Sequence, residues 1–499
     1  MDRSVARRVV VVGLVLGLFA ESLFNGPALG INVPVGVAAL LVGAWLVRRR
    51  GTAPDPVDAW LPIAAAACAV FVALSGDRFL AVVDAVAALT FAGASVVAAA
   101  GIPVTRRSAA VVAMLAAWAT ASVLAGAAGA IQAARPRELV RRRVPDRARV
   151  VVRGLALGIP VALLFAVLFA SADPIFRRAM DDLLGFRIDL GDAPGRLLFA
   201  LACAWLAAGV LSIAADGIPA MAGASLGAAA GSPAVVRAPA RRLGTPEAVI
   251  VLVLVDLVSA AFVALQVAYL FGGLDTLAAA GMTYSDYARR GFFELVAAAC
   301  LAGGLIVALD IATGARTRAF LAAGLVLVGL TVVVLASAWL RLELYQLAYG
   351  WTELRFYVAA AILTLAIALG FGALMMTLDR MRWLAHGLAA IGLVALLGVN
   401  AMAPGAFVAE RNVERLLHPE LVPADGWAGL DTRYLAALGD DAIPVLVEAV
   451  AQIPEPYRAD VLAQLRARQA ELTTDPAWTS PAAWNLARER AKESLATLP

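Results

Sequence analysis

Two segments of the 499-residue chain concentrate ionisable and aromatic side chains that could bind an anion or carry a proton, 284–294 and 337–357. In the second segment Arg341 and Tyr345 are four residues apart, and so are Tyr345 and Tyr349. A continuing helix would place these three side chains on one face. The spacing therefore predicts a polar surface at the end of a helix.

Gly350 is expected to break this helix, and the next helix is expected to begin at Thr352. A broken helix near a membrane face is one way in which membrane proteins build a cavity. We predict an outward-facing pocket in which arginines hold an anion or headgroup, tyrosines line the wall, and Glu294 and Glu343 are counter-charges or proton carriers. The predicted pocket residues are Asp286, Tyr287, Arg289, Arg290, Glu294, Arg341, Glu343, Tyr345, Tyr349, Arg355 and Tyr357. Alternatively, these residues pair with one another and fasten three helix ends together.

Other chemistries find little support in the sequence. The only histidines, His386 and His418, have no nucleophile nearby in sequence, and the three cysteines form no CxxC pair or metal spacing. No metalloprotease, phosphate-loop or dinucleotide motif occurs. We expect no metal and no cofactor. An enzyme acting within the membrane, with Glu294 or Asp286 as the base, is the third hypothesis for function.

The composition indicates a membrane protein. Hydrophobic residues make up 62% of the chain and charged residues only 16%, whereas soluble domains are nearer 45–50% and about 25%. A membrane helix needs about 20 apolar residues. The sequence contains twelve such runs, near 9–24, 31–47, 60–75, 79–99, 109–131, 151–172, 196–215, 247–272, 291–311, 319–340, 354–377 and 383–403.

Arginines in the short loops predict the orientation, because positive loops stay in the cytoplasm. The basic loop 135–150 is the strongest signal, and basic residues near 240, 317 and 381 are consistent with it. The tail then lies outside. Arginines near residues 3–8 and 48–50 also favour the cytoplasm, so one of the next three apolar runs should not cross. The run 60–75 is the shortest, and we expect it to be re-entrant or interfacial, which leaves eleven crossings and an N-terminus inside. If the rule fails locally instead, all twelve runs cross and the N-terminus is outside.

The tail differs from the rest of the chain, since it is charged and punctuated by proline. Val445, Val450 and Leu465 belong to apolar positions at helical spacing. We therefore predict an all-α, polytopic membrane protein with 11–12 transmembrane helices and a small C-terminal helical domain outside the membrane. The predicted divisions are N-terminal transmembrane helices at 1–134, a basic cytoplasmic loop at 135–150, a main transmembrane domain at 151–403 and a C-terminal extracytoplasmic domain at 404–499.

Several motifs are spread over most of the chain. They are Ser171-Ala-Asp173-Pro, Tyr287–Leu295, Ser337–Arg355, Arg411-Asn412-xx-Arg415, Leu430–Leu435 followed by Asp440–Pro444, and Trp484-Asn485 with Ala487-Arg488. Together these motifs resemble a bacterial multi-pass membrane family known as domain of unknown function 4173, with its 4153 relatives. Trp351 departs from the family's smaller apolar residue. No activity is assigned to the family, so the resemblance supports the membrane prediction alone.

Two main hypotheses for function follow. The first is a bacterial plasma (inner) membrane protein that binds or moves a polar or amphiphilic solute or lipid through the predicted pocket. The second is a sensor or scaffold that does not transport and whose tail engages an envelope protein. The expected environment is the lipid bilayer. We expect no nucleic acid partner, because the basic runs carry no interleaved aromatic residues for stacking.

Overall fold

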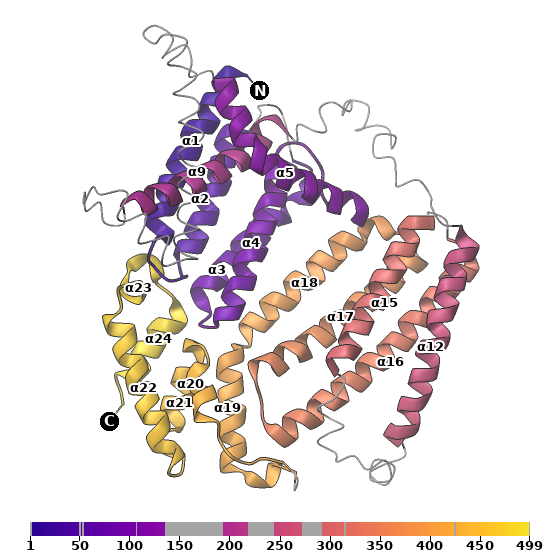
Figure 1. The fold of residues 1–499 in the computed structure, drawn as a ribbon, viewed down its shortest axis with the longest axis vertical. Coiled ribbons are helices and arrows are strands. Elements are labelled where there is room, and N and C mark those ends of the chain that lie inside the picture. The colour runs from indigo at the N-terminus through magenta and orange to yellow at the C-terminus, as the bar shows by residue number, and fades with distance from the viewer. Residues whose placement is uncertain are drawn as a thin grey trace, which may run out of the picture.

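A computed structural model describes residues 2–48, 51, 54–105, 107–134, 193–217, 244–271, 292–313, 316–423 and 426–498. Within these ranges the regular structure is entirely helical (Figure 1). Eight of the described helices are long and apolar enough to cross a membrane. This confirms the predicted fold class, an all-α polytopic membrane protein. The predicted span 151–172 and the basic loop 135–150 lie outside the described residues.

The first helix group consists of α1–α5 and α9. Glycines in α1 allow a close approach to α9: a Cβ on Gly17 would lie 2.4 Å from the Ala204 Cβ, and one on Gly13 would lie 2.9 Å from the Ala208 Cβ. The Gly13-xxx-Gly17 pair is thus an internal packing face, as small residues often are in membranes. The helices are α1 (Arg3–Phe24), α2 (Asn32–Val47), α3 (Trp60–Leu74), α4 (Arg78–Ala99), α5 (Ala109–Ala134) and α9 (Ala193–Asp216), with the 3-10 turn η1 (Pro56–Asp58) before α3.

The run 60–75, expected to be re-entrant, instead forms α3, which joins the two ends of the first helix group. At its start the Trp60 indole donates to Thr105, and just past its end the Gly76 N–H donates to Asp441 of the tail. Helix α5 behaves differently. Its buried Leu115 and Ala130 pack against the halves of α1, α2, α4 and α9 that are remote from the tail, and α5 lies across that end in Figure 1. The described contacts of α5 thus lie at one end of the first helix group, whereas those of α3 reach both ends.

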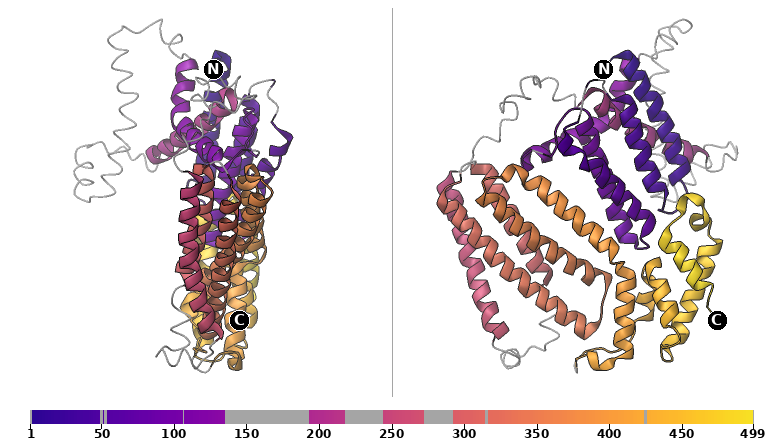
Figure 2. Two further views of the ribbon diagram at one scale, coloured as in Figure 1. Left: turned by 90° about the vertical axis from the view of Figure 1, so that its right-hand side faces the viewer. Right: turned by 180° about the vertical axis from the view of Figure 1, so that it is seen from behind.

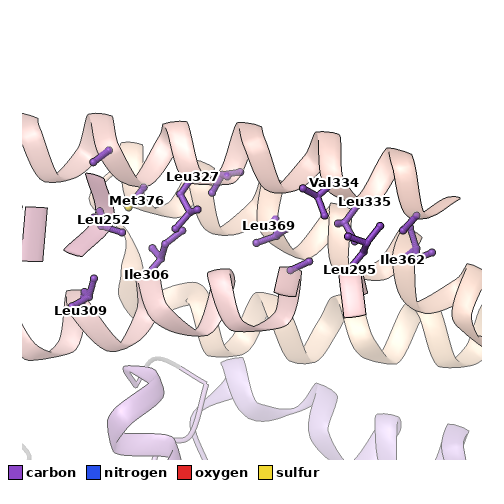
Figure 3. Packing of buried hydrophobic residues seen from close by; sticks show 14 of the residues in the cluster. Leu252, Leu295, Ile306, Leu309, Leu327, Val334, Leu335, Ile362, Leu369 and Met376 are labelled. Atoms are coloured by element: carbon purple, nitrogen blue, oxygen red, sulfur yellow. The ribbon is translucent and has the colours of Figure 1, made fainter. Parts of the chain in front are cut away.

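The second helix group consists of α12 (Thr245–Phe271), α15 (Phe292–Thr313), α16 (Arg318–Tyr349) and α17 (Glu353–Thr377). Its core is a continuous apolar cluster contributed by all four helices, in which Phe320, Leu252 and Leu327 have no exposed surface. Figure 3 shows other members of the cluster, such as Leu335, Ile362 and Leu369, lying between the helices. Beyond this core the group is apolar on its outside too, as expected for helices that face lipid: Val258 is 72% exposed and Leu301 is 74% exposed.

Helix α18 (Leu384–Ala401), preceded by η2 (Met381–Trp383), lies between the two groups in Figure 1. Leu393 and Leu396 pack against apolar residues of α3 and α4. At its start His386 stacks edge-on against Trp60 and Trp383. Contacts made by α18 and by the tail thus join the two groups.

Viewed from the side, the helices form an array much thinner than it is wide (Figure 2).

Residues 404–498, here called the C-terminal unit, fold as short helices at one end of both groups (Figure 1). Val408, Ile453 and Leu472 are fully buried in a separate apolar core. The unit contains α19 (Pro404–Leu417), η3 (Pro419–Leu421), α20 (Thr432–Ala437), η4 (Asp440–Ala442), α21 (Ile443–Ala449), α22 (Tyr457–Thr474), α23 (Pro476–Thr479), η5 (Pro481–Ala483) and α24 (Leu486–Leu495).

Candidate functional site at the base of the C-terminal unit

The structure describes only part of the predicted pocket. Asp286, Tyr287, Arg289 and Arg290 lie outside the described residues, as does the side chain of Glu294 at the start of α15. On α16 the Arg341 side chain is buried, while Glu343 is exposed on another side of the helix. The pairing of Arg341 with Glu294 therefore stays a prediction.

The predicted tyrosine face and helix break are both present. The rings of Tyr345 and Tyr349 meet edge-on with centroids 5.3 Å apart. Helix α16 ends at Gly350, whose φ of +82° is a left-handed conformation that glycine adopts without strain. The Arg355 guanidinium lies 3.9 Å above the Tyr345 ring and donates to the Gly350 carbonyl. Arg355 thus holds the two sides of the break together.

Two side chains of α19 close this break from the C-terminal unit. The Asn412 amide donates to the Trp351 carbonyl and accepts from the Trp351 N–H, both at 2.9 Å. Arg415 is buried, and its Nη2 donates to the Leu347 carbonyl at 2.9 Å. It also reaches the carbonyls of Ala348 and Trp427 at 3.3 Å. Because the last carbonyls of a helix lack partners within it, Arg415 caps α16.

On the first helix group, the C-terminal unit contacts the turn between α3 and α4. A Cβ on Gly439 would lie 2.4 Å from the Gly76 carbonyl oxygen, so the two backbones touch and both positions require glycine. The Asp441 carboxylate accepts from the Gly76 N–H at 2.6 Å and from the Ser75 hydroxyl at 3.4 Å. The Asn485 amide donates to the carbonyls of Val72 and Ser75 at 2.9 and 2.8 Å, which caps α3.

Asp440, beside Asp441, is held by two arginines. Its Oδ1 accepts from Arg468 Nη2 at 2.7 Å, and its Oδ2 lies 3.5 Å from Arg488 Nε. The two guanidinium groups also lie over the Trp478 ring, at 4.9 and 4.5 Å from its centroid. Burial lowers the pKa of Arg488. Burial also acts to lower the pKa of Arg468, but the charges and hydrogen bonds of Asp440 and Glu471 together outweigh it and raise that pKa.

Asp441 also belongs to a second set of acidic and phenolic groups, which lies between the C-terminal unit and the starts of α4 and α17. Asp77 caps the start of α4 by accepting from the Leu80 N–H at 2.8 Å. Its other oxygen accepts from the Tyr357 hydroxyl, and the Glu353 carboxyl lies close enough for the two acidic groups to interact electrostatically. The Glu353 N–H donates to the Tyr434 hydroxyl of the C-terminal unit at 2.7 Å. We call Asp77, Glu353, Tyr357, Tyr434 and Asp441 the acidic junction.

The acidic junction combines three carboxyl groups with two phenols, and none of these carboxyl groups forms an ion pair among the described residues. Burial raises the pKa of Asp441 to about 6, and the nearby charges of Asp77 and Asp440 add to the effect. The Gly76 N–H opposes it. Burial likewise raises the pKa of Tyr434 to about 12. The junction can therefore store protons at its carboxyl groups in a way that an exposed acidic surface would not.

Other chemistry is less compatible with this arrangement. Among the described residues no group of three or more His, Cys, Asp or Glu side chains could hold a metal. His418 is exposed beside Glu420, and His386 lies between two tryptophan rings. Neither histidine activates a nucleophile in the described part of the chain. The arrangement is suited to docking and proton binding.

A family model described as Domain of unknown function (DUF4153) matches residues 35–449. The chain belongs to this family. The sequence resemblance had placed 4153 among the relatives of 4173, and 4153 is the family that matches. Comparisons with curated proteins and with solved structures gave no match.

The DUF4153 chain brings together motifs that are far apart in its sequence. Asn412 and Arg415 bind the break after α16, while Asp441 and Asn485 bind the turn after α3. Sequence reasoning quoted these tail residues as motifs and did not assign them to the site. It also missed Asp77, whose contact with Tyr357 joins residues 280 positions apart. The polar motifs of the tail were the signal that could have revealed this site, because polar residues of a docked segment need hydrogen-bond partners on the helices that it contacts.

Proposed function

We propose that this protein is a membrane sensor or scaffold of the bacterial plasma membrane. In this proposal the C-terminal unit lies on the outer face, sets the relative position of the two helix groups and presents itself to an envelope protein. The observation that carries the proposal is that the unit bonds both groups at once. It caps α3 in the first group through Asn485 and α16 in the second through Arg415.

Charge supports the orientation of this proposal. The connections that follow α2, α4, α15 and α17 lie at the end opposite the C-terminal unit (Figure 1). The sequence places Arg48, Arg107, Arg316 and Arg380 on these connections. Positive loops favour the cytoplasm, so the unit is expected outside. Reporter fusions after residue 498 and in the 380–383 turn test this, and a cytoplasmic signal from the C-terminal fusion would contradict it.

The sensor proposal is tested by measuring the distance between the helix groups. Spin labels at the exposed positions Val42 on α2 and Ile367 on α17 report this distance, in protein whose native cysteines are replaced by alanine. Gly439→Leu should wedge the unit away from Gly76, because there is no room for even a Cβ. We expect the distance distribution to broaden or shift in this variant.

Glu448→Gln, an exposed change on the same unit, is the matched control and should leave the distribution unchanged. The proposal fails if Gly439→Leu releases the unit, as shown by faster amide exchange over 430–446, while the distance between the labels stays the same. Coupling between the unit and the helix groups would then be absent.

Binding of an anionic solute or headgroup at the helix break is the second candidate function. Arg355 lies close enough to Arg415 that its charge, after burial, lowers the pKa of Arg415. No ion pair joins either arginine to an acidic side chain among the described residues. Two guanidinium groups without a carboxylate are suited to a phosphate or carboxylate.

Thermal unfolding in nanodiscs with and without inorganic phosphate, and with anionic or zwitterionic lipid, tests this second function. Wild type should be stabilised by the anion and Arg355→Gln should not. Equal responses from the two proteins would exclude an anion at this break and would leave the sensor proposal standing.

A further inference from the structure

Asp84 and Asn400 form a polar contact inside the apolar packing between α4 and α18. Asp84 has no exposed surface, and Asn400 is 6% exposed. The Asn400 amide donates to Asp84 Oδ1 at 3.1 Å and to the Leu396 carbonyl at 3.0 Å. Asp84 is six residues from the start of α4, so it lies about 9 Å along the helix. The contact is therefore inside a membrane-spanning segment, where a polar pair indicates function.

Each member of this pair keeps one buried oxygen without a hydrogen-bond donor in the described part of the chain. These atoms are Asp84 Oδ2 and Asn400 Oδ1. Both are acceptors if Asp84 is ionised, so neither can satisfy the other. A single proton on Asp84 Oδ2 changes this, because a carboxylic acid has one O–H donor. The acid would then donate to the Asn400 oxygen while the Asn400 amide donates to the acid.

Asp58 shows how the same chain accommodates a buried carboxylate differently. Asp58 is 3% exposed, and each of its oxygens accepts a backbone N–H, from Val104 at 3.1 Å and from Thr105 at 2.8 Å. Both oxygens of this carboxylate therefore have a hydrogen-bond donor. Asp84 receives one neutral amide donor, and leaving a buried charge with so little compensation is unfavourable.

The titratable groups around Asp84 are carboxyl, phenol and thiol groups. Asp77 precedes it as the N-cap of α4. Helix α3 contributes Cys68, whose thiol is within electrostatic range of Asp84. On α9, Cys203 lines the same cavity as Ala85. Helix α2 contains no titratable residue, and Asn400 is the polar partner on α18. Beyond Asp77, toward the C-terminal unit, lie four more titratable groups, those of Glu353, Tyr357, Asp440 and Asp441. Among the described residues no arginine or lysine forms an ion pair with Asp84.

We propose that Asp84 and Asn400 form an intramembrane proton-binding site that ties α18 to α4. The proton comes from water and converts the Asp84 carboxylate to the acid, whose O–H donates to Asn400. The acidic junction lies between this pair and the end that carries the C-terminal unit, so it provides carboxyl and phenol groups through which the proton enters. Loss of the proton removes one of the two hydrogen bonds between the helices. This inference goes beyond the sensor function and does not depend on it.

Labelling with a hydrophobic carbodiimide tests the proposal, since this reagent modifies protonated carboxyl groups within membranes. Wild-type protein in nanodiscs is treated across a pH series, and the modified residues are identified by mass spectrometry. We expect labelling of Asp84 at pH 7 that declines as the pH rises. Asp58 is the internal control and should stay unlabelled, because its oxygens accept backbone N–H groups.

Infrared spectroscopy provides an independent measurement on the same samples. The spectrum of wild type minus Asp84→Asn should contain the C=O band of a carboxylic acid. Asn400→Leu, which keeps Asp84 but removes its partner, should shift that band to higher frequency. If Asp84→Asn does not fold, wild-type labelling and the Asn400→Leu spectrum still show whether Asp84 is protonated.

The proposal is overturned if Asp84 is unlabelled at pH 7 and wild type lacks the acid band that Asn400→Leu would shift. It is also overturned if sodium, but not choline, blocks labelling at constant pH. The site would then take a metal cation in place of the proton.

Discussion

Replacing Asp441 by Asn should strengthen docking of the C-terminal unit at neutral pH. Asp441 is packed against the Gly76 N–H, and burial raises its pKa from 3.8 to about 6. One pKa unit corresponds to about 1.4 kcal/mol, so the shift of about 2 units is worth ~3 kcal/mol. Asn keeps an acceptor for the Gly76 N–H and removes the charge that Asp77 and Asp440 repel.

The sign of the pH dependence follows from the raised pKa. Asp441 stabilises docking fully below about pH 4, where its carboxyl group is protonated in both the docked and the released state. This stabilisation is lost as the pH rises through about 6, and docking does not depend on the titration of Asp441 at higher pH. Asp441→Asn should remove this dependence. At pH 7.5 its docked state should gain up to ~3 kcal/mol, which slows amide exchange of the docked segments by up to ~100-fold.

Hydrogen–deuterium exchange measures this change in docking free energy. Peptides covering 75–81 and 432–446 are followed in nanodiscs at pH 5 and pH 7.5, and the rates are corrected for intrinsic exchange. Asp440→Asn is the matched control, one residue away. It should have the opposite effect, because it leaves the buried Arg488 without its carboxylate, at a cost of about 3 kcal/mol or more. Slower exchange in Asp440→Asn, or faster exchange at pH 7.5 in Asp441→Asn, would refute the reasoning.

Three further substitutions test other contacts. Asn485→Ala leaves the carbonyls of Val72 and Ser75 without their donor and should weaken docking by about 1–3 kcal/mol, seen as faster proteolysis of the C-terminal unit; unchanged proteolysis would contradict this. Gly17→Ala forces a Cβ to within 2.4 Å of the Ala200 carbonyl oxygen and should lower the stability of the protein to thermal unfolding by about 1–3 kcal/mol. Gly93→Ala is the control, because the space around its Cβ is open, and should leave the stability unchanged. Equal melting temperatures for the two variants would show that α1 and α9 are not packed closely. Arg415→Met should lose the cap of α16 and speed amide exchange over 344–350, and exchange as slow as in wild type would rule out the cap.

The sequence alone was sufficient for the class of fold and for many of the helices. Apolar runs of membrane length cannot be satisfied except as helices in lipid, so runs such as 319–340 and 354–377 are helical wherever they lie. The break at Gly350 was also predictable, because glycine after Tyr349 favours the end of a helix. These are local properties, determined by residues within a few turns of one another.

The tertiary structure decided which runs join the two ends of the array. Apolar content cannot distinguish α3 from α5, since both are apolar and helical. The distinction lies in their contacts. The Trp60 side chain at the start of α3 and the Gly76 N–H just past its end make contacts at opposite ends of the group, whereas buried side chains of α5 pack at one end. Packing of this kind depends on shape complementarity between distant segments, which has no periodic signal in the sequence.

The site shows the same division more sharply. The sequence indicated where arginines and tyrosines concentrate, and the geometry of Tyr345, Tyr349 and Arg355 agrees with that pattern. It gave no sign that Asp77 or Asp441 is buried, because a carboxylate beside a turn normally faces water. The folded chain places the two side chains together although they are far apart in the sequence, and exclusion of water and mutual repulsion change their chemistry. Residue types are determined by the sequence, but their protonation depends on which groups the tertiary structure places beside them and how much water it removes.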